Sequence, residues 1–238
     1  MQLYYKSILF VFFLLTGTIG RAQDDSTNVT GPALDTVSSL RRLEDRPFRH
    51  SLVPFSLVGY GLLAQAVNPL DELDRSLQGA FSRSSRQTRV DDYLQYAPVA
   101  AFYGMKAAGL PSRHNLAGGT LIYMLSAVVV TVTTQGGKRI FGRTRPDGSS
   151  DNSFPSGHTA TAFAGAEFFN REYGGLSPWY GVAAYTTAAT TGYLRIYNNK
   201  HWFSDVLAGA GIGILSARFS GWLAPRLFRR VFRRGPRS

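Results

Sequence analysis

Two long stretches without a charged residue constrain most strongly what this chain can fold into. Leu116–Gln135 contains 20 uncharged residues and Ser177–Leu194 contains 18, and a helix needs about 20 mostly apolar residues to cross a bilayer. Other apolar segments of helical length accompany them, so the sequence predicts an all-α fold, a six-helix bundle embedded in a membrane. The six helices are expected at about 52–67, 93–110, 116–136, 158–170, 178–194 and 202–224.

Charges within the predicted helices leave a soluble bundle open as the alternative. The mean hydropathy of −0.09 is low for a chain that lies mostly in lipid. Glu167 and Arg171 fall in the fourth or next to it, and Arg218 falls in the sixth. Small residues favour the membrane bundle, because they let helix backbones approach closely. They are dense in the last two helices: Ala183, Ala184, Ala188, Ala189, Ala208, Gly209, Gly211 and Gly213.

The two ends of the chain differ in composition from the middle. Residues 1–23 contain an apolar stretch followed by the small residues Gly20 and Ala22, a pattern typical of a secretory signal peptide. The chain has no cysteine, which excludes disulfides and thiol chemistry. The predicted organisation is a signal peptide (1–23), a flexible linker (24–50), a helical domain (51–225) and an Arg-rich C-terminal tail (226–238).

The net charge of +11 is concentrated at the C-terminus. Six arginines lie within 226–238, and without them the charge falls to +5. No basic face of a folded module is evident, so we expect no nucleic-acid partner. A basic tail instead favours a cytoplasmic C-terminus beside anionic lipid. The last helix would then run inward, with Asp205 near its start on the outer, periplasmic side of an inner membrane; this requires that the segment 52–67 does not span.

Three short blocks carry most of the remaining chemistry, and the first is Lys138–Pro146 (KRIFGRTRP). An arginine grips two phosphate oxygens in a fork, and a lysine acts as a point charge. Lys138 and Arg145 lie seven residues apart, so a helix from Gly137 would place both on one face. Taken alone, the block is equally compatible with a solvated basic loop.

The second block is Phe154–His158 (FPSGH), which opens a predicted helix at Pro155. The amides of Ser156, Gly157 and His158 would be free donors at a helix N-terminus, a natural anion site. His158 is placed to protonate a leaving alkoxide. An ordinary helix cap beside a surface histidine is the alternative.

The third block is Arg195–Asp205 (RIYNNKHWFSD). His201 and Asp205 are four residues apart, so the carboxylate can hold one imidazole nitrogen and leave the other as a nucleophile. Arg195 supplies a third cation for phosphoryl oxygens. A purely structural His–Asp contact is the alternative, and the spacing does not favour a metal site.

Together the three blocks resemble the signature of the type 2 phosphatidic-acid phosphatase superfamily. Its pattern is Lys-x6-Arg-Pro, then Pro-Ser-Gly-His, then Ser-Arg-x5-His-x3-Asp. The first two blocks match in full, and the third matches except at Leu194, where the family usually has serine. The resemblance implies an all-helical bundle and a two-step reaction without metal or other cofactor. The order of the predicted helices independently places the three blocks at one end of the bundle.

Carried over by this resemblance, three residues would be catalytic. His201 attacks phosphorus, Asp205 orients it, and His158 protonates the leaving oxygen and then assists water. The phosphate oxygens would be held by Lys138, Arg145, Ser156, Gly157 and Arg195.

The resemblance makes a lipid phosphatase the leading hypothesis, with isoprenyl diphosphates, phosphatidic-acid-like lipids or lipid A as candidate substrates. A soluble periplasmic acid phosphatase, a vanadate-dependent haloperoxidase and a membrane scaffold with a vestigial anion pocket are the alternatives.

Overall fold

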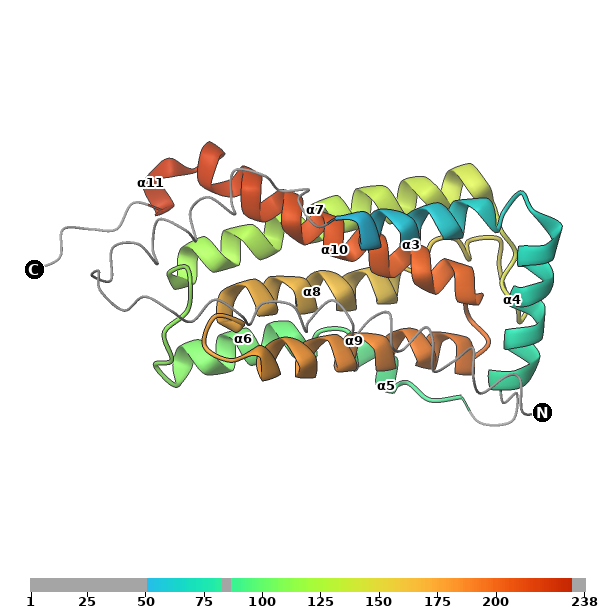
Figure 1. Cartoon of the computed structure of the whole chain (residues 1–238), viewed down its shortest axis with the longest axis horizontal. Helices are drawn as coiled ribbons and strands as arrows, with labels where there is room; N and C mark the ends of the chain where they lie inside the picture. The colour runs from blue at the N-terminus through green and yellow to red at the C-terminus, as the bar shows by residue number, and fades with distance from the viewer. Residues whose placement is uncertain (1–50, 83–86, 233–238) are drawn as a thin grey trace, which may run out of the picture. The chain divides into compact units, whose positions relative to one another are not determined.

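The computed structural model describes residues 51–82 and 87–232, and its secondary structure there is α-helical, as predicted (Figure 1). The helices in chain order are α3 (Leu52–Leu63), α4 (Asn68–Phe81), α5 (Val90–Leu94), α6 (Ala97–Ala107), α7 (Leu116–Phe141), α8 (Gly157–Tyr173), α9 (Pro178–Tyr197), α10 (Phe203–Leu227) and α11 (Arg229–Phe232). The predicted signal peptide and linker lie outside the described residues, and α10 continues two residues into the segment assigned to the tail.

The predicted helices are confirmed with two corrections. The segment expected at 93–110 breaks into α5 and α6 around Gln95, with Pro98 in the first turn of α6. The helix α4 was not predicted, because its sequence NPLDELDRSLQGAF is amphipathic and polar on average, whereas the prediction relied on apolar runs. This helix crosses the end of the bundle at which α7 ends and α10 begins (Figure 1).

The centre of the bundle is α8, which packs against α6, α7, α9 and α10. Phe102 from α6 meets Phe168 of α8 edge to face, with ring centroids 4.8 Å apart. Tyr173 lies against the same cluster and is fully buried. Rings in this geometry add about 0.5–1.5 kcal/mol beyond the apolar area they bury, so this cluster fixes α6 against α8.

Glycines bring α10 directly onto the backbone of α8. A methyl group added at Gly209 would collide with the carbonyl of Ser156, and one at Gly213 would collide with that of Ala160. The close backbone approach predicted from the small residues of α10 is therefore confirmed. It also sets the N-terminus of α8 beside the start of α10.

Two of the charges that favour a soluble bundle, those of Glu167 and Arg218, are paired with each other inside the bundle. Arg218 Nε of α10 donates to Glu167 Oε1 of α8 at 2.8 Å, and the Tyr185 hydroxyl of α9 donates to the same carboxylate. Glu167 is buried. A buried charge is tolerated when it is paired and hydrogen-bonded, so these residues join three helices rather than expose charge on the outer surface.

Two of the described helices, α7 and α10, are long and apolar enough to cross a membrane. Along α7, the side chains of Met124, Val128 and Val132 recur every fourth residue and are each more than half exposed, an apolar stripe typical of a lipid-facing helix. The second predicted span, Ser177–Leu194, forms most of α9, which is not one of these two helices. The helix α9 contains four threonines, which make it less apolar. The helix α3 has 12 residues, too few to span at 1.5 Å per residue.

Candidate active site

The three sequence blocks lie at one end of the bundle, where α7 and α9 end and α8 and α10 begin (Figure 1). The amide of Ser156 donates to the Asp205 carbonyl at 3.0 Å and so ties the second block to the third. Lys200 Nζ donates to Asp147 Oδ2 at 2.6 Å, which ties the third block to the loop that follows the first. These contacts bring residues far apart in sequence into one region.

His201 lies in the loop before α10 and is buried, with Nδ1 3.6 Å from Asp205 Oδ2. This separation is longer than a hydrogen bond, and Nδ1 has no hydrogen-bond partner among the described residues. Burial lowers the pKa of His201 to about 4, with Asp205 opposing the shift and the charges of Arg195 and Lys138 adding to it. The ring is therefore neutral near pH 7, the form in which a nitrogen can attack.

Asp205 is held by groups that the sequence did not predict. Its Oδ1 accepts a 2.9 Å hydrogen bond from Arg143, and its Oδ2 accepts bonds from the Ser153 hydroxyl and from the Trp202 amide, the latter at 2.9 Å. The Trp202 contact caps the N-terminus of α10. Both oxygens of the carboxylate are thus held by hydrogen bonds to groups other than His201.

Arg143 extends this network to α4. Its Nη2 lies 2.8 Å from Asp74 Oδ2, and its Nη1 donates to the Ser204 hydroxyl at 2.7 Å. Its guanidinium also lies over the Trp202 ring, 5.2 Å from the centroid. Arg143 lies within the first sequence block, and Ser153 directly precedes the second. Asp74 lies in a polar segment without a motif, so this partner is evident only from the fold.

The three predicted phosphate-binding cations lie close enough for their charges to repel one another. Lys138 Nζ donates to the Asn152 carbonyl, Arg195 donates to Asp91, and Arg145 Nε is buried without a hydrogen-bond partner among the described residues. Burial and the Arg195 charge lower the pKa of Arg145. A bound anion would relieve this repulsion.

One local prediction for the first block is wrong. The helix α7 ends at Phe141, because Gly142 adopts the left-handed conformation (φ 53°). Arg145 consequently lies in the following loop and shares no helix face with Lys138. The loop brings the two side chains together instead.

The second block forms the N-terminus of α8, with one correction. The Ser156 amide is used by Asp205, as described above, and its hydroxyl contacts Thr159 Oγ1 at 2.9 Å. The amides of Gly157 and His158 remain in the first turn, where a helix offers no acceptor of its own. Space is open beside Gly157, so an anion could approach there.

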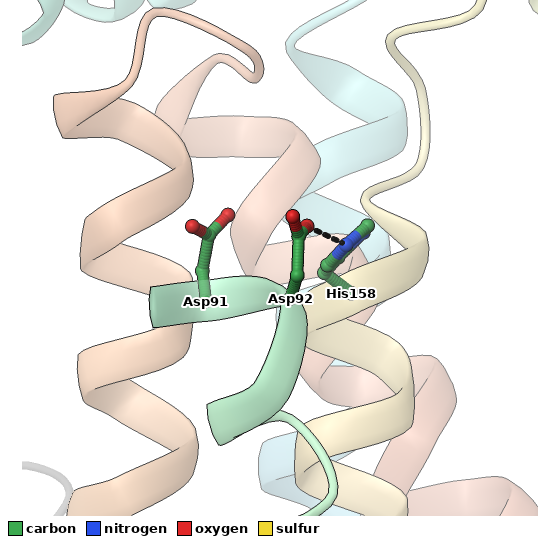
Figure 2. Close-up of side chains that lie close together, drawn as sticks. All are labelled: Asp91, Asp92 and His158. Atoms are coloured by element: carbon green, nitrogen blue, oxygen red, sulfur yellow. Dashed lines mark hydrogen bonds and ion pairs between the residues drawn. The ribbon is translucent and has the colours of Figure 1, made fainter. Parts of the chain in front are cut away.

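His158 contacts a residue that the sequence did not predict: its Nε2 lies 2.9 Å from Asp92 Oδ1 of α5 (Figure 2). Asp91, Asp92 and His158 each have one atom that could bind a metal ion, and these three atoms all lie within 4.8 Å of one another. Asp91 already accepts hydrogen bonds from Arg195 and Asn198. A cation at this point would compete with Arg195, so the cluster fits an ion-pair network better than a metal site.

Leu194 lies in the last turn of α9, directly before Arg195, and is partly exposed. Its carbonyl accepts a hydrogen bond from the Asn198 amide at 2.8 Å, a contact that any residue could make. Nothing in the structure explains the leucine at this position.

Comparison with known proteins points to one superfamily. The model of the PAP2 superfamily matches residues 119–229. Over 183 residues the chain is 43% identical to the lipid A 1-phosphatase of Porphyromonas gingivalis, covering 76% of this chain and 39% of that protein. It is 35% identical to the lipid A 1-phosphatase of Rhizobium johnstonii, covering 39% of this chain and 49% of that protein. The chain thus spans half or less of the length of these relatives.

Among solved structures, the fold is similar to that of a transmembrane PAP2 type phosphatidylglycerolphosphate phosphatase from Bacillus subtilis. The two sequences are 20% identical, and the two structures align with a TM-score of 0.51. The alignment covers 76% of this chain and 98% of that chain. At this identity the likeness concerns the fold.

Proposed function

Because the chain belongs to the PAP2 superfamily, we propose that it is a metal-independent lipid phosphatase that works through a phosphohistidine. The observation that carries this proposal is a buried histidine with a lowered pKa beside three mutually repelling cations. A neutral nucleophile next to an anion-binding cluster is what phosphoryl transfer requires.

In the first step His201 attacks phosphorus and forms a P–N bond, while the bond to the leaving oxygen breaks. His158 gives its proton to that oxygen. Lys138, Arg145 and Arg195, with the first amides of α8, stabilise the charge on the phosphoryl oxygens. Asp205 stabilises the cationic phosphohistidine.

In the second step water attacks phosphorus, and the neutral His158 accepts a proton from it. The P–N bond breaks, its electron pair returns to His201, and inorganic phosphate leaves. No metal or other cofactor enters either step.

For the substrate, we propose the phosphate of a membrane lipid, with lipid A 1-phosphate first among the candidates. Two relatives are lipid A 1-phosphatases, and the exposed apolar stripe of α7 would place the site at a lipid surface. Phosphatidic-acid-like lipids and isoprenyl diphosphates share the same phosphoryl chemistry and remain to be compared directly.

The decisive experiment is release of inorganic phosphate from lipid A, phosphatidic acid, an isoprenyl diphosphate and a soluble phosphate ester, with EDTA present. We expect turnover that EDTA does not affect and that His201→Ala abolishes. Full activity of His201→Ala would overturn the mechanism, and binding of lipid phosphate without turnover would favour a scaffold.

For the location, we propose the inner membrane with the site facing the periplasm, on the basis of the basic C-terminal tail. A tag placed after Ser238 should resist protease added to intact spheroplasts. Cleavage of that tag would reverse the proposed orientation.

A further inference from the structure

The short helix α5 directs two consecutive carboxylates to two different groups of the proposed site. Asp91 Oδ2 accepts from Arg195 of the third block, and Asp92 Oδ1 meets His158 Nε2 of the second block at 2.9 Å (Figure 2). These partners lie 104 and 66 residues away in the sequence. One helical turn therefore touches both the predicted general acid and a predicted phosphate ligand.

Asp91 anchors this turn. Its side chain is 1% exposed, and besides Arg195 it accepts a 3.0 Å bond from Asn198 Nδ2. Asn198 also exchanges hydrogen bonds with the backbone of Thr88, at 3.0 and 2.8 Å. The start of α5 is thus fixed to the end of α9, and this fixes the place of Asp92.

Asp92 has a different environment, since 49% of its side chain is exposed, against 32% for His158. Burial and the positive charge of Arg195 lower the pKa of His158, while the bond to Asp92 and the negative charges of Asp91 and Asp92 act in the opposite direction. Among the described residues, the charged groups that act on this imidazole are Arg195 on α9 and the two carboxylates on α5. Without the carboxylates, the nearby arginine would disfavour the protonated ring that a general acid requires.

We propose that Asp92 is a positioning residue for His158, a role that rests on the function proposed above. Its bond to Nε2 holds the plane of the ring and leaves Nδ1 as the nitrogen that delivers the proton to the leaving oxygen. The proton passes from His158 to the leaving oxygen as the P–O bond breaks and the bond from His201 to phosphorus forms.

The test compares Asp92→Asn and Asp92→Glu in the full chain, with Glu72→Gln as the matched control. Glu72 is an exposed carboxylate on α4, so its substitution removes the same charge without removing the contact to His158. Two probes are used: the panel lipid that the wild type hydrolyses fastest, and p-nitrophenyl phosphate, whose nitrophenolate leaves without needing a proton.

We expect Asp92→Asn to lower kcat for the lipid about 5- to 20-fold with little change in KM, since a general acid contributes roughly 10²–10⁴-fold and only its positioning is impaired. The loss with p-nitrophenyl phosphate should be clearly smaller. The alkaline limb of kcat/KM should move to lower pH, because an imidazole without its carboxylate loses its proton more readily. Asp92→Glu should recover most of the activity.

The inference is overturned if Asp92→Asn matches Glu72→Gln in kcat and pH profile, or if it loses equal activity on both probes with an unshifted pH profile. The latter result would indicate a purely structural role. These outcomes are distinct from failure of the proposed function, in which the wild type releases no phosphate from either probe.

Discussion

Arg143 donates a 2.9 Å hydrogen bond to Asp205, the carboxylate that also faces His201. The imidazole is farther from this carboxylate than the guanidinium is, with Nδ1 at 3.6 Å from Oδ2. The carboxylate therefore has a cationic partner even without the proposed phosphohistidine. Burial keeps His201 neutral, and the bond from Arg143 holds Asp205 in place to receive the positive charge of the proposed intermediate.

Arg143→Lys tests this relationship while keeping the charge. Lysine cannot reproduce the fork that reaches Asp205, Asp74 and Ser204 together, so we expect kcat/KM to fall at least 10-fold. Loss of buried charged hydrogen bonds worth about 1.5–3 kcal/mol should lower the melting temperature by several degrees. Arg139→Lys is the matched control, because Arg139 is an exposed neighbour on α7. If both variants have the same kcat/KM and melting temperature, Arg143 does not have the role described here.

Substitution of the two arginines of the cation cluster should separate binding from stability. Arg145→Ala removes a guanidinium whose Nε has no hydrogen-bond partner in the described part of the chain. We expect a loss of about 10²–10³-fold in kcat/KM with no fall in the melting temperature.

Arg195→Ala should lose comparable activity and stability as well. It leaves Asp91 buried without its cation, and breaking a buried pair costs about 3–5 kcal/mol. Kinetics and thermal unfolding of both variants in the same detergent provide the comparison. A large drop in melting temperature for Arg145→Ala alone would contradict it.

The pH dependence follows from the lowered pKa of His201, which is about 4. The proposed nucleophile stays neutral well below the usual histidine pKa of about 6.5, so kcat/KM should fall on the acid side only as pH approaches 4, once the titration of the substrate phosphate is taken into account. An acid limb centred near the ordinary histidine value would show that His201 is not held in this way.

The same shift has a consequence for stability. Between pH about 4 and about 6.5 the unfolded chain binds a proton at His201 that the folded chain does not. The free energy of unfolding is therefore highest above this window, and it decreases as the pH falls through the window. His201→Gln should flatten this part of the curve of unfolding free energy against pH.

His158→Ala should separate the two chemical steps. With the lipid substrate we expect a loss of about 10²–10⁴-fold. With p-nitrophenyl phosphate the first step needs no proton, so nitrophenolate should appear in a burst and phosphate should remain on the protein. Acid-labile label that appears in His158→Ala and is absent from the double variant with His201→Ala would identify the phosphohistidine; a burst that survives in the double variant would point to another nucleophile.

The sequence predicted the elements that carry a strong local signal. The helix α7 follows from an uncharged run of 20 residues, and the meeting of the three blocks follows from the order of the helices. The close packing at Gly209 follows from a row of small residues. Each of these features depends on the chain near it.

The sequence could not predict partners chosen by the fold. Asp74, Asp91 and Asp92 lie in charged segments that look like ordinary solvated surface. The packing of α4 and α5 buries Asp74 and Asp91 and brings the half-exposed Asp92 to His158. Lys138 and Arg145 share no helix face for a local reason. Gly142, which lies between them, ends the helix in a left-handed conformation, and a seven-residue spacing does not by itself indicate such an end.

The repulsion among Lys138, Arg145 and Arg195 implies that the folded protein is under electrostatic tension that an anion releases. Thermodynamic linkage then requires that any ligand which binds the folded state preferentially also stabilises it. The melting temperature should therefore rise with inorganic phosphate, the product of the proposed reaction. A site built to neutralise the proposed transition state in this way retains affinity for what it releases, so free phosphate at high concentration should compete with the substrate.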